Sequence, residues 1–408
     1  MLVILRESVS SCRTMIGRTE EGIVDIYSEL GITPVINAAG AITRMGGNTP
    51  SSVVRDAMKE AERHYFGMAD LLDKTGAKLA EMLGVESVLI TSGCTSSLML
   101  SAAACITGNS VANIKRIPNT EGLPNQFIAL EPLHYTYERS VELVGGQLVF
   151  VGDRMEASIT SVVDAICDRT AGIYYVAHED SAPSPSNLQN ACIKVPELEK
   201  IIEVAKSHGL PVIVDAASHV YPIDNLSKFA KMGADLVGYG GKYFGGFNSS
   251  GLLMGRKDLI DIAKKHNFVA QEFEETELFM PFGRAMKLDR QEVVGTYVAV
   301  REWITMNHEA RFAEYAARVD GFRRLMLGVN GVNILDFPNK GPVNGVRVKI
   351  DDTETGKSLR AIKDELVNGN PIVWVGKSEW NDSLLLKFDL LNEGEEKMIA
   401  ARLKEIIL

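Results

Sequence analysis

A lysine surrounded by glycines is the residue best suited to covalent chemistry in this sequence. Lys242 lies in the stretch Gly-Tyr-Gly-Gly-Lys-Tyr-Phe-Gly-Gly, directly after the apolar run 236–239. Ligands of open α/β sheets bind beyond the carboxyl ends of the strands, and glycines let the backbone approach a ligand closely. A phosphate-binding P-loop is excluded, because that motif needs Ser or Thr after the lysine and Tyr243 stands there. The alternative reading of Lys242 is a solvated turn residue.

An aspartate marks the end of a neighbouring predicted strand. Asp215 closes the apolar run Pro-Val-Ile-Val-Asp, which places its carboxylate at the carboxyl edge of the sheet. A carboxylate there could cap the following helix. The functional alternative is a charged partner for the ring nitrogen of a cofactor, since an opposite charge a few ångströms away keeps such a nitrogen protonated.

A third candidate is a strand-turn-helix junction in the first half of the chain. The segment Thr-Ser-Gly-Cys-Thr-Ser at 91–96 contains Gly93, Cys94 and Thr95. Small residues at a helix start expose backbone N–H groups, and the helix dipole adds about half a positive charge, so the junction could bind phosphate. The simpler interpretation is an ordinary N-cap formed by Thr95 or Ser96.

A histidine and the order of the candidates complete the pattern. His134 follows the apolar run 127–130 and could stack on an aromatic ring or fill a partly buried loop. Along the chain come a phosphate-type helix start, this loop aromatic, Asp215 and then Lys242, 27 residues later (242 − 215). That gap leaves room for one helix and one strand. The same linear order is typical of fold-type-I pyridoxal-phosphate (PLP) enzymes.

Continuous apolar runs must form the sheet that positions these residues. The runs cover 88–91, 127–130, 147–151, 172–177, 211–216 and 236–239. Such runs indicate strands buried on both faces of a mainly parallel sheet, with helix-like stretches at 96–106, 140–144, 158–167 and 197–208 between them. The run 251–254 follows Lys242 after a link too short for a parallel crossover, which predicts an antiparallel return. The predicted fold class is α/β, with a mainly parallel seven-stranded sheet.

The pattern changes after about residue 284. A long helical stretch, 290–306 continuing to about 327, precedes shorter strands at 332–336, 345–350, 371–375 and 383–388, and a terminal helix at 393–407. We therefore predict an N-terminal arm (1–40), a large cofactor-binding domain (41–284) and a small α+β domain (285–408). The arm is expected to pack on the large domain or on a partner subunit.

Composition excludes several classes of protein. The chain has 408 residues, of which 46% are hydrophobic and 24% charged, and its formal net charge is −10. That charge argues against a nucleic-acid partner, because phosphate binding relies on clustered Lys and Arg. No run of about 18 apolar residues predicts a membrane span, and the N-terminus is unlike a signal peptide. The five scattered cysteines show no zinc-type spacing and fit free thiols in a reducing cytoplasm.

Taken with these motifs, the sequence resembles the selenocysteine synthase (L-seryl-tRNA selenium transferase)-like superfamily of fold-type-I PLP enzymes, and most of all its D-glucosaminate-6-phosphate ammonia-lyase branch. The resemblance runs from about residue 34 to residue 303. It rests on Pro-Val-Ile-Asn-Ala-Ala-Gly at 34–40, Thr-Ser-Gly-Cys-Thr-Ser at 91–96, Val-Asp-Ala-Ala-Ser at 214–218, Gly-Lys-Tyr-Phe-Gly-Gly at 241–246 and Gly-Arg-Ala-Met-Lys-Leu-Asp at 283–289.

The resemblance implies a role for each candidate residue. Lys242 would carry pyridoxal 5'-phosphate as a Schiff base, and Asp215 would face the pyridine nitrogen. The implied ring contacts are Ala217 on one face and His134 on the other, and the implied phosphate donors are Gly93, Cys94 and Thr95. Arg284 would hold an anionic group of the substrate, as the planar guanidinium suits; its alternative is a surface salt bridge. A homodimer or higher oligomer with shared active sites is also implied.

The implied activity is removal of ammonia, after β-elimination of water, from an amino acid or a 2-amino sugar acid, with D-glucosaminate 6-phosphate as one candidate. Lys242, its pKa lowered by nearby positive charge, would act as general base. An amino-acid racemase or epimerase would use the same residues and stays open. A tRNA-dependent transferase is disfavoured, because only about 34 residues precede Val-Ile-Asn-Ala and Gly47-Asn48-Thr49-Pro50 replaces a Gly-Arg-Ser-Pro turn. A cofactor-binding protein without catalysis is the remaining alternative.

Overall fold

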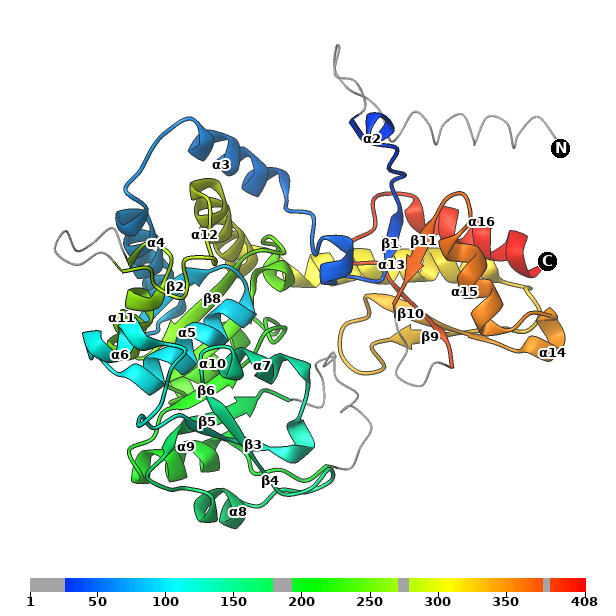
Figure 1. The fold of residues 1–408 in the computed structure, drawn as a ribbon. Coiled ribbons are helices and arrows are strands. Elements are labelled where there is room, and N and C mark those ends of the chain that lie inside the picture. Colours follow the sequence, from blue (N-terminus) through cyan, green and yellow to red (C-terminus); the bar gives the residue numbers. More distant parts are fainter. Residues whose placement is uncertain (1–25, 179–192, 271–278, 377–381) are drawn as a thin grey trace. The chain divides into compact units, whose positions relative to one another are not determined.

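The structure, a computed structural model, describes residues 26–178, 193–270, 279–376 and 382–408 (Figure 1). Contacts between residues divide the chain into two compact units. Of the described residues, the large unit holds those within 40–313 and 340–342, and the small unit holds those within 26–39, 314–339 and 343–408. The boundaries at residues 40 and 284, which separate the predicted arm, cofactor-binding domain and small domain, stay a prediction.

A seven-stranded sheet forms the centre of the large unit (Figure 1). Its strands, in spatial order, are β2 (Ser87–Thr91), β8 (Gly251–Gly255), β7 (Leu236–Gly240), β6 (Val212–Asp215), β5 (Thr170–Val176), β3 (Gln126–Leu130) and β4 (Gln147–Val151). Only β8 runs antiparallel to its neighbours β2 and β7; the other pairs within this sheet are parallel. The predicted α/β class, the seven strands and the antiparallel return of 251–254 are therefore confirmed, with bounds within two residues.

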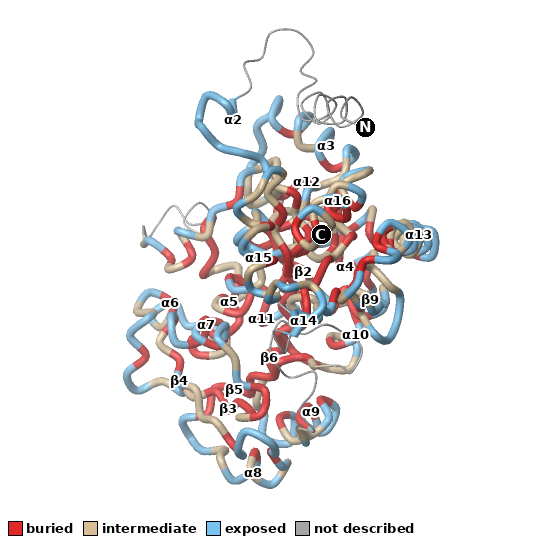
Figure 2. The backbone as a smooth tube through the Cα atoms, turned by 90° about the vertical axis from the view of Figure 1, so that its right-hand side faces the viewer, coloured by how far each residue is buried: buried red, intermediate tan, exposed pale blue. Residues whose placement is uncertain are grey.

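Helices cover both faces of this sheet, and every residue of β5 to β8 is therefore buried. Helix α5 (Cys94–Thr107) packs against β6, β7 and β8, while α9 (Leu198–Ser207) packs against β5 and β6. Figure 2 shows the buried strands inside a layer of exposed helix surface. The remaining helices of the unit are α3 (Ser52–Glu62), α4 (Met68–Leu83), α6 (Val111–Arg116), α7 (Arg139–Glu142), α8 (Ile159–Asp164), α10 (Asn225–Met232), α11 (Lys257–His266) and α12 (Arg290–Thr305).

The long helix predicted at 290–327 is two helices. Helix α12 ends at Thr305 and α13 (His308–Met326) starts three residues later. Met306 adopts an extended conformation, and the side-chain oxygen of Asn307 accepts a hydrogen bond from Ala310 N at 3.0 Å. Asparagine is a favoured N-cap, so Asn307 starts a new helix where the apolar periodicity alone indicated continuation.

The small unit contains a three-stranded antiparallel sheet, β12 (Leu384–Lys387), β10 (Gly345–Ile350) and β9 (Val332–Phe337). Its helices α15 (Leu359–Val367) and α16 (Glu395–Ile407) bury Ile362 and Leu403 in a core with Phe322 and Phe388. The end of the N-terminal arm, β1 (Ile36–Ala38), pairs in parallel with β11 (Val373–Val375) of this unit. This strand thus pairs within the small unit, while the expected packing of the arm on the large domain or on a partner subunit stays a prediction.

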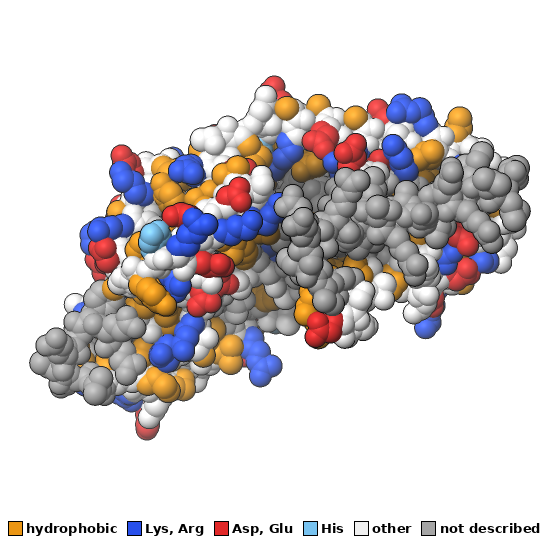
Figure 3. Space-filling view, turned by 90° about the horizontal axis from the view of Figure 1, so that it is seen from above, with side chains coloured by type: hydrophobic (Ala, Val, Ile, Leu, Met, Phe, Trp, Pro, Cys, Tyr) orange, Lys and Arg blue, Asp and Glu red, His pale blue; other side chains and the backbone are white. Residues whose placement is uncertain are grey.

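The surface carries both signs of charge close together. On the face drawn in Figure 3, basic and acidic side chains of the described residues are interspersed. Many form short-range pairs along helices, such as Lys74 with Asp70 at 2.7 Å and Lys78 with Glu81 at 2.9 Å. Exposed pairs of this kind contribute little to stability, because solvent screens them. They keep the surface polar without forming a field of one sign.

Candidate active site

A cavity of about 580 Å³ opens at the carboxyl ends of β2, β5, β6 and β7. Lys242, Asp215, Ala217, Gly93, Cys94 and Thr95 all line it. These residues come from three separate parts of the chain and meet because the carboxyl ends of parallel strands share one edge of the sheet. The fold therefore brings together six of the eight candidate residues identified from the sequence.

Lys242 sits in a single turn of 3-10 helix, Gly241–Phe244, that follows β7 directly. The turn is held to the start of β8, since Gly241 N donates to Ser250 O at 2.7 Å. Lys242 Nζ donates a hydrogen bond to Thr43 Oγ1 at 2.8 Å. Partial burial is the main cause that lowers the pKa of Lys242, and no neighbouring cation contributes. Burial thus acts in the expected direction, and the effect of nearby positive charge in the substrate-bound enzyme stays a prediction.

Asp215 is the last residue of β6 and is only 4% exposed. Its Oδ1 accepts hydrogen bonds from Ala217 N at 3.1 Å and from Cys94 Sγ at 3.5 Å, and its Oδ2 accepts from Tyr174 OH at 3.3 Å. Burial raises the pKa of Asp215 to about 6, with the Ala217 and Cys94 hydrogen bonds acting in the opposite direction. Within the part of the chain that the structure describes, none of its hydrogen-bond partners is a Lys or Arg.

Helix α5 begins at the cavity. Gly93, at its N-cap, has φ +95° and ψ 166°, a conformation that L side chains rarely adopt. A Cβ built on Gly93 would have no atom within 4 Å, so the backbone there faces open space. The 14 residues of α5 direct their unpaired first N–H groups and the positive end of the helix dipole to the same place. This arrangement suits an anionic group such as phosphate.

His134 and Arg284 are not among the described residues that line the cavity. His134 Nδ1 lies 2.6 Å from Glu138 Oε2, and its ring packs edge-on against Phe150, with centroids 4.6 Å apart. Burial raises the pKa of Glu138 to about 7, while His134 opposes this shift. Arg284 is half-buried in a turn where its backbone N donates to Pro281 O at 3.0 Å. The contacts assigned to these two residues stay predictions.

Several further residues that were not identified from the sequence line the cavity, among them Thr43, Arg44 and Tyr135. Thr43 and Arg44 belong to a short 3-10 helix, Thr43–Met45, that precedes the first strand of the large sheet. No strand-end pattern marks that segment, so the strand-edge argument could not reach it. Tyr135 is the residue after His134, and the aromatic pair in that loop was the only available signal.

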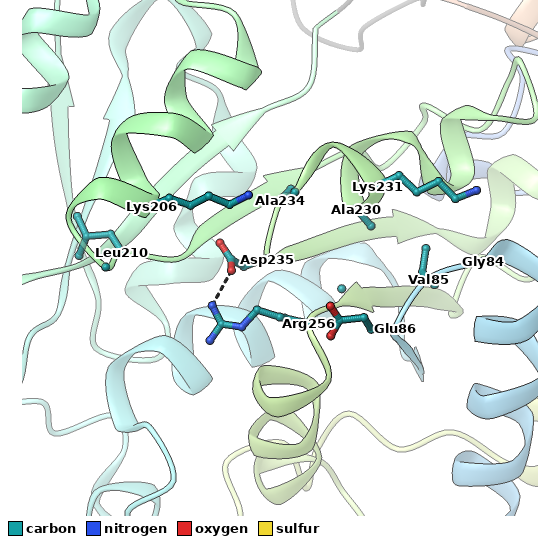
Figure 4. A pocket seen from close by; sticks show the side chains of 13 residues that line it. Gly84, Val85, Glu86, Lys206, Leu210, Ala230, Lys231, Ala234, Asp235 and Arg256 are labelled. Atoms are coloured by element: carbon teal, nitrogen blue, oxygen red, sulfur yellow. Dashed lines mark hydrogen bonds and ion pairs between the residues drawn. The ribbon is translucent and has the colours of Figure 1, made fainter.

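A second cavity, of about 490 Å³, lies at the opposite, amino-terminal edge of the parallel strands (Figure 4). There Asp235 Oδ1 accepts from Arg256 Nη1 at 2.8 Å, and Lys206 and Lys231 extend from the last turns of α9 and α10. Lys206 Nζ lies beside Gly233, the C-cap of α10. Lysines favour helix C-termini through the dipole, so these charges have a structural explanation.

Further features of the described residues concern cysteines, metals and membranes. Cys94, Cys105 and Cys167 are free thiols, while Cys12 and Cys192 lie outside the described residues. In the part of the chain that the structure describes, no group of His, Cys, Asp and Glu side chains is arranged to hold a metal ion. None of the described helices combines the length and hydropathy needed to cross a membrane.

Comparison with known proteins finds relatives that align along nearly the whole chain. No family model matches the sequence. The chain is 27% identical over 390 residues to a 5'-C-glycyluridine monooxygenase-decarboxylase of a Streptomyces species, covering 94% of this chain and 92% of the relative. It is 26% identical over 390 residues to the D-glucosaminate-6-phosphate ammonia lyase of Salmonella typhimurium, covering 94% and 98%. An L-seryl-tRNA(Sec) selenium transferase of Nautilia profundicola is 25% identical over 255 residues, covering 58% and 54%.

Solved structures agree with these relatives. A structure of D-glucosaminate-6-phosphate ammonia-lyase superposes with a TM-score of 0.79 at 25% identity, covering 95% of this chain and 99% of the other. A NifS-like protein superposes with a TM-score of 0.53 at 13% identity, covering 91% and 99%, which supports the fold alone. The fold is that of fold-type-I PLP enzymes, and the resemblance to the selenocysteine synthase-like superfamily is confirmed. The full-length relatives are enzymes.

Proposed function

We propose that the protein is a PLP-dependent ammonia lyase that acts on an anionic amino acid or 2-amino sugar acid. One observation carries the proposal. A single cavity contains the Lys242 amine, the buried carboxylate of Asp215 and the N-terminus of α5. The proposal is supported by whole-length similarity to an enzyme named D-glucosaminate-6-phosphate ammonia lyase.

The residues of the cavity fit this cofactor in three respects. The backbone at Gly93 faces open space at a helix N-terminus, as a phosphate group requires. Asp215 is a buried carboxylate whose hydrogen-bond donors among the described residues are neutral, so a protonated ring nitrogen would supply a charge partner. Asn248 also lines the cavity, and its buried Oδ1 has no hydrogen-bond partner among the described residues. When bound, the cofactor would supply an aldehyde that bonds to an amine and a ring that takes up electrons.

Lys242 would move the proton, and Thr43 would hold its amine in place. Partial burial favours the neutral form of the Lys242 amine, and a neutral amine is the form that can accept a proton from the substrate α-carbon. The Thr43 hydroxyl, 2.8 Å from Nζ, would hold that amine in place. Asp215, at the floor of the cavity, would keep its negative charge next to the cofactor ring.

Arg44 is the arginine that lines the cavity, and we assign to it the anionic group of the substrate. A guanidinium can bind a carboxylate or phosphate through two parallel hydrogen bonds. Arg284 retains the role implied by the family resemblance until it is tested. Arg44→Ala and Arg284→Ala, compared side by side, separate the two assignments. The variant that lacks the anion-binding arginine should show a KM raised about tenfold or more, as expected for the loss of one charge-assisted contact.

The cofactor assignment has a test that does not depend on knowing the substrate. Protein incubated with PLP should show a visible absorption band, and borohydride should fix the cofactor on the peptide that contains Lys242. Lys242→Ala should lose both signals, while Lys257→Ala, which removes an exposed lysine paired with Asp261, should keep them. Borohydride labelling of another lysine in the wild-type protein would contradict the assignment.

The reaction is tested with a panel of β-hydroxy amino acids and 2-amino sugar acids, each with and without phosphate. Release of ammonia with formation of a keto acid supports the lyase. A change of optical rotation without ammonia supports a racemase or epimerase. The similarity to a monooxygenase-decarboxylase gives a second candidate, which would consume oxygen and release carbon dioxide from a substrate with a glycyl group. Measuring ammonia, keto acid, optical rotation, oxygen consumption and carbon dioxide on one panel distinguishes the three activities.

A further inference from the structure

Asp215 is held from two sides by side chains that the proposed chemistry does not use. Tyr174, in β5, donates its hydroxyl to Oδ2 at 3.3 Å, and Cys94, at the start of α5, donates its thiol to Oδ1 at 3.5 Å. Ala217 N completes the set at 3.1 Å. Tyr174 is 1% exposed, so its hydroxyl is buried beside the carboxylate. Each oxygen of Asp215 therefore has its own side-chain donor, and the plane of the carboxylate is fixed.

The sheet and helix leave room for these donors. Tyr174 pairs with Ile213 across the β5–β6 ladder, two residues before Asp215, so the two side chains lie on the same face of adjacent strands. A Cβ on Gly238 of β7 would lie 3.2 Å from Cys94 Sγ and 3.3 Å from Ser97 Cβ. A glycine at 238 thus allows the start of α5 to approach the sheet closely enough for the thiol to reach Asp215.

Neutral donors differ from a cation in their effect on a carboxylate. A lysine or arginine beside Asp215 would neutralise it and compete with a ring nitrogen for the same charge. Hydroxyl, thiol and amide donors orient the carboxylate and reduce the cost of burying it, but they leave its charge in place. Lys242 and His219 line the same cavity as Asp215, and the titratable groups that interact with its carboxylate are Cys94, Tyr174 and Tyr243. The pKa values of all three are raised, so each stays neutral near pH 7.

We propose that Tyr174 and Cys94 are positioning residues that hold the Asp215 carboxylate ionised and aimed at the ring nitrogen of the cofactor. Cys94 would then serve both ends of the cofactor, with its backbone at the phosphate and its thiol on Asp215. This inference rests on the proposed PLP chemistry. It assigns to the β5 tyrosine and the α5 cysteine a function that neither their burial nor their sequence pattern indicates.

The test measures the affinity of the protein for PLP as a function of pH, by titration of the visible band. Tyr174→Phe and Cys94→Ala remove one donor each. Cys94→Ser keeps a donor at the same place. Tyr175→Phe is the matched control, because Tyr175 is the next residue of β5, is 3% exposed and bonds instead to His178 Nδ1 and Pro196 O, both at 3.3 Å.

Removal of either donor should weaken PLP binding about tenfold near pH 7, as expected for one hydrogen bond to a charged group. It should also move the acid limb of the affinity profile to higher pH, because Asp215 would bind its proton more readily. Cys94→Ser should restore most of the wild-type profile, and Tyr175→Phe should leave it in place. A variant that only loosened the structure would lower affinity at all pH values without moving the limb.

The outcomes separate this inference from the proposed function. If the wild-type protein gives no visible band with PLP, the proposed function is wrong and the positioning role is wrong with it. If the wild-type band is present but Tyr174→Phe and Cys94→Ala follow Tyr175→Phe at every pH, only the positioning role is refuted. Should Tyr174→Phe fail to fold, the pair Cys94→Ala and Cys94→Ser decides the question alone.

Discussion

Replacing Asp215 with asparagine should make the cofactor-free protein more stable and, at the same time, unable to bind PLP tightly. Asp215 is buried, and its pKa in the folded protein is raised from 3.8 to about 6. A carboxyl group whose folded pKa is raised stabilises the fold below its unfolded pKa, and that stability is lost as the pH rises through the folded value. The stabilisation by Asp215 is therefore lost between about pH 4 and a pH somewhat above 6.

The magnitude follows from the two pKa values. They differ by about 2.2, and each pKa unit corresponds to about 1.36 kcal/mol, so burying the charged form costs about 3 kcal/mol at pH 8. Asparagine has nearly the same shape and no charge to bury. Its amide oxygen can accept from Ala217 N and its amide nitrogen can donate to the Tyr174 hydroxyl. Asp215→Asn should thus raise the free energy of unfolding by up to about 3 kcal/mol at pH 8, and by little at pH 4.

The assay is urea unfolding of wild type and variant, both stripped of cofactor, at several pH values between 4 and 8. Only the difference between the two proteins is interpreted, because other carboxylates titrate equally in both. In parallel, PLP affinity should fall in the variant, since the ring nitrogen loses its charge partner. A stability difference that is absent at pH 8, or that is the same at pH 4 and pH 8, would refute the burial argument.

Three further predictions concern the rest of the cavity. Gly93→Ala should lower both the stability of the protein and its PLP affinity, the affinity at least tenfold. Gly108→Ala meets similar backbone strain away from the cavity (φ +51°) and should lower stability alone. Urea unfolding measures the stability, and absorbance titration measures the affinity. Tyr135→Ala should weaken PLP binding more than His134→Ala, because Tyr135 lines the cavity; the reverse order would favour the ring-stacking role implied for His134. Thr43→Val should lower the pKa of Lys242 further, because it removes the hydroxyl that accepts a hydrogen bond from the ammonium group at 2.8 Å. The acid limb of the kcat profile should therefore move to lower pH. Thr43→Ser keeps the hydroxyl and should keep the wild-type limb.

Much of the fold could be predicted because buried parallel strands are continuous apolar runs. The ends of such runs predicted that Asp215 and Lys242 lie at one edge of the sheet, and both residues line the cavity. The break between α12 and α13 was missed, since a capping Asn307 within a helical pattern is a weak signal beside apolar periodicity. Strand order was also beyond reach, because the position of β8 between β2 and β7 depends on tertiary packing.

The directions of side chains within the candidate site could not be predicted from the sequence. His134 was correctly placed in the loop after β3, but its ring contacts the buried Glu138, while its neighbour Tyr135 lines the cavity. Thr43 reaches Lys242 across 199 positions of sequence, and no local pattern encodes such an approach. The hydroxyl of Tyr174 lies within an apolar strand, where a tyrosine reads as a core residue.

The antiparallel strand β8 has a consequence for the size of molecule that the cavity admits. Its first residue, Gly251, pairs with Thr91 on one side and Gly240 on the other, so it separates the turn before α5 from the turn that carries Lys242. Two strand spacings set these turns roughly 9.5 Å apart along the sheet. β8 thus acts as a spacer between the proposed anion-binding end and the amine-bearing end of the cavity. A molecule that contacts both ends must span this distance.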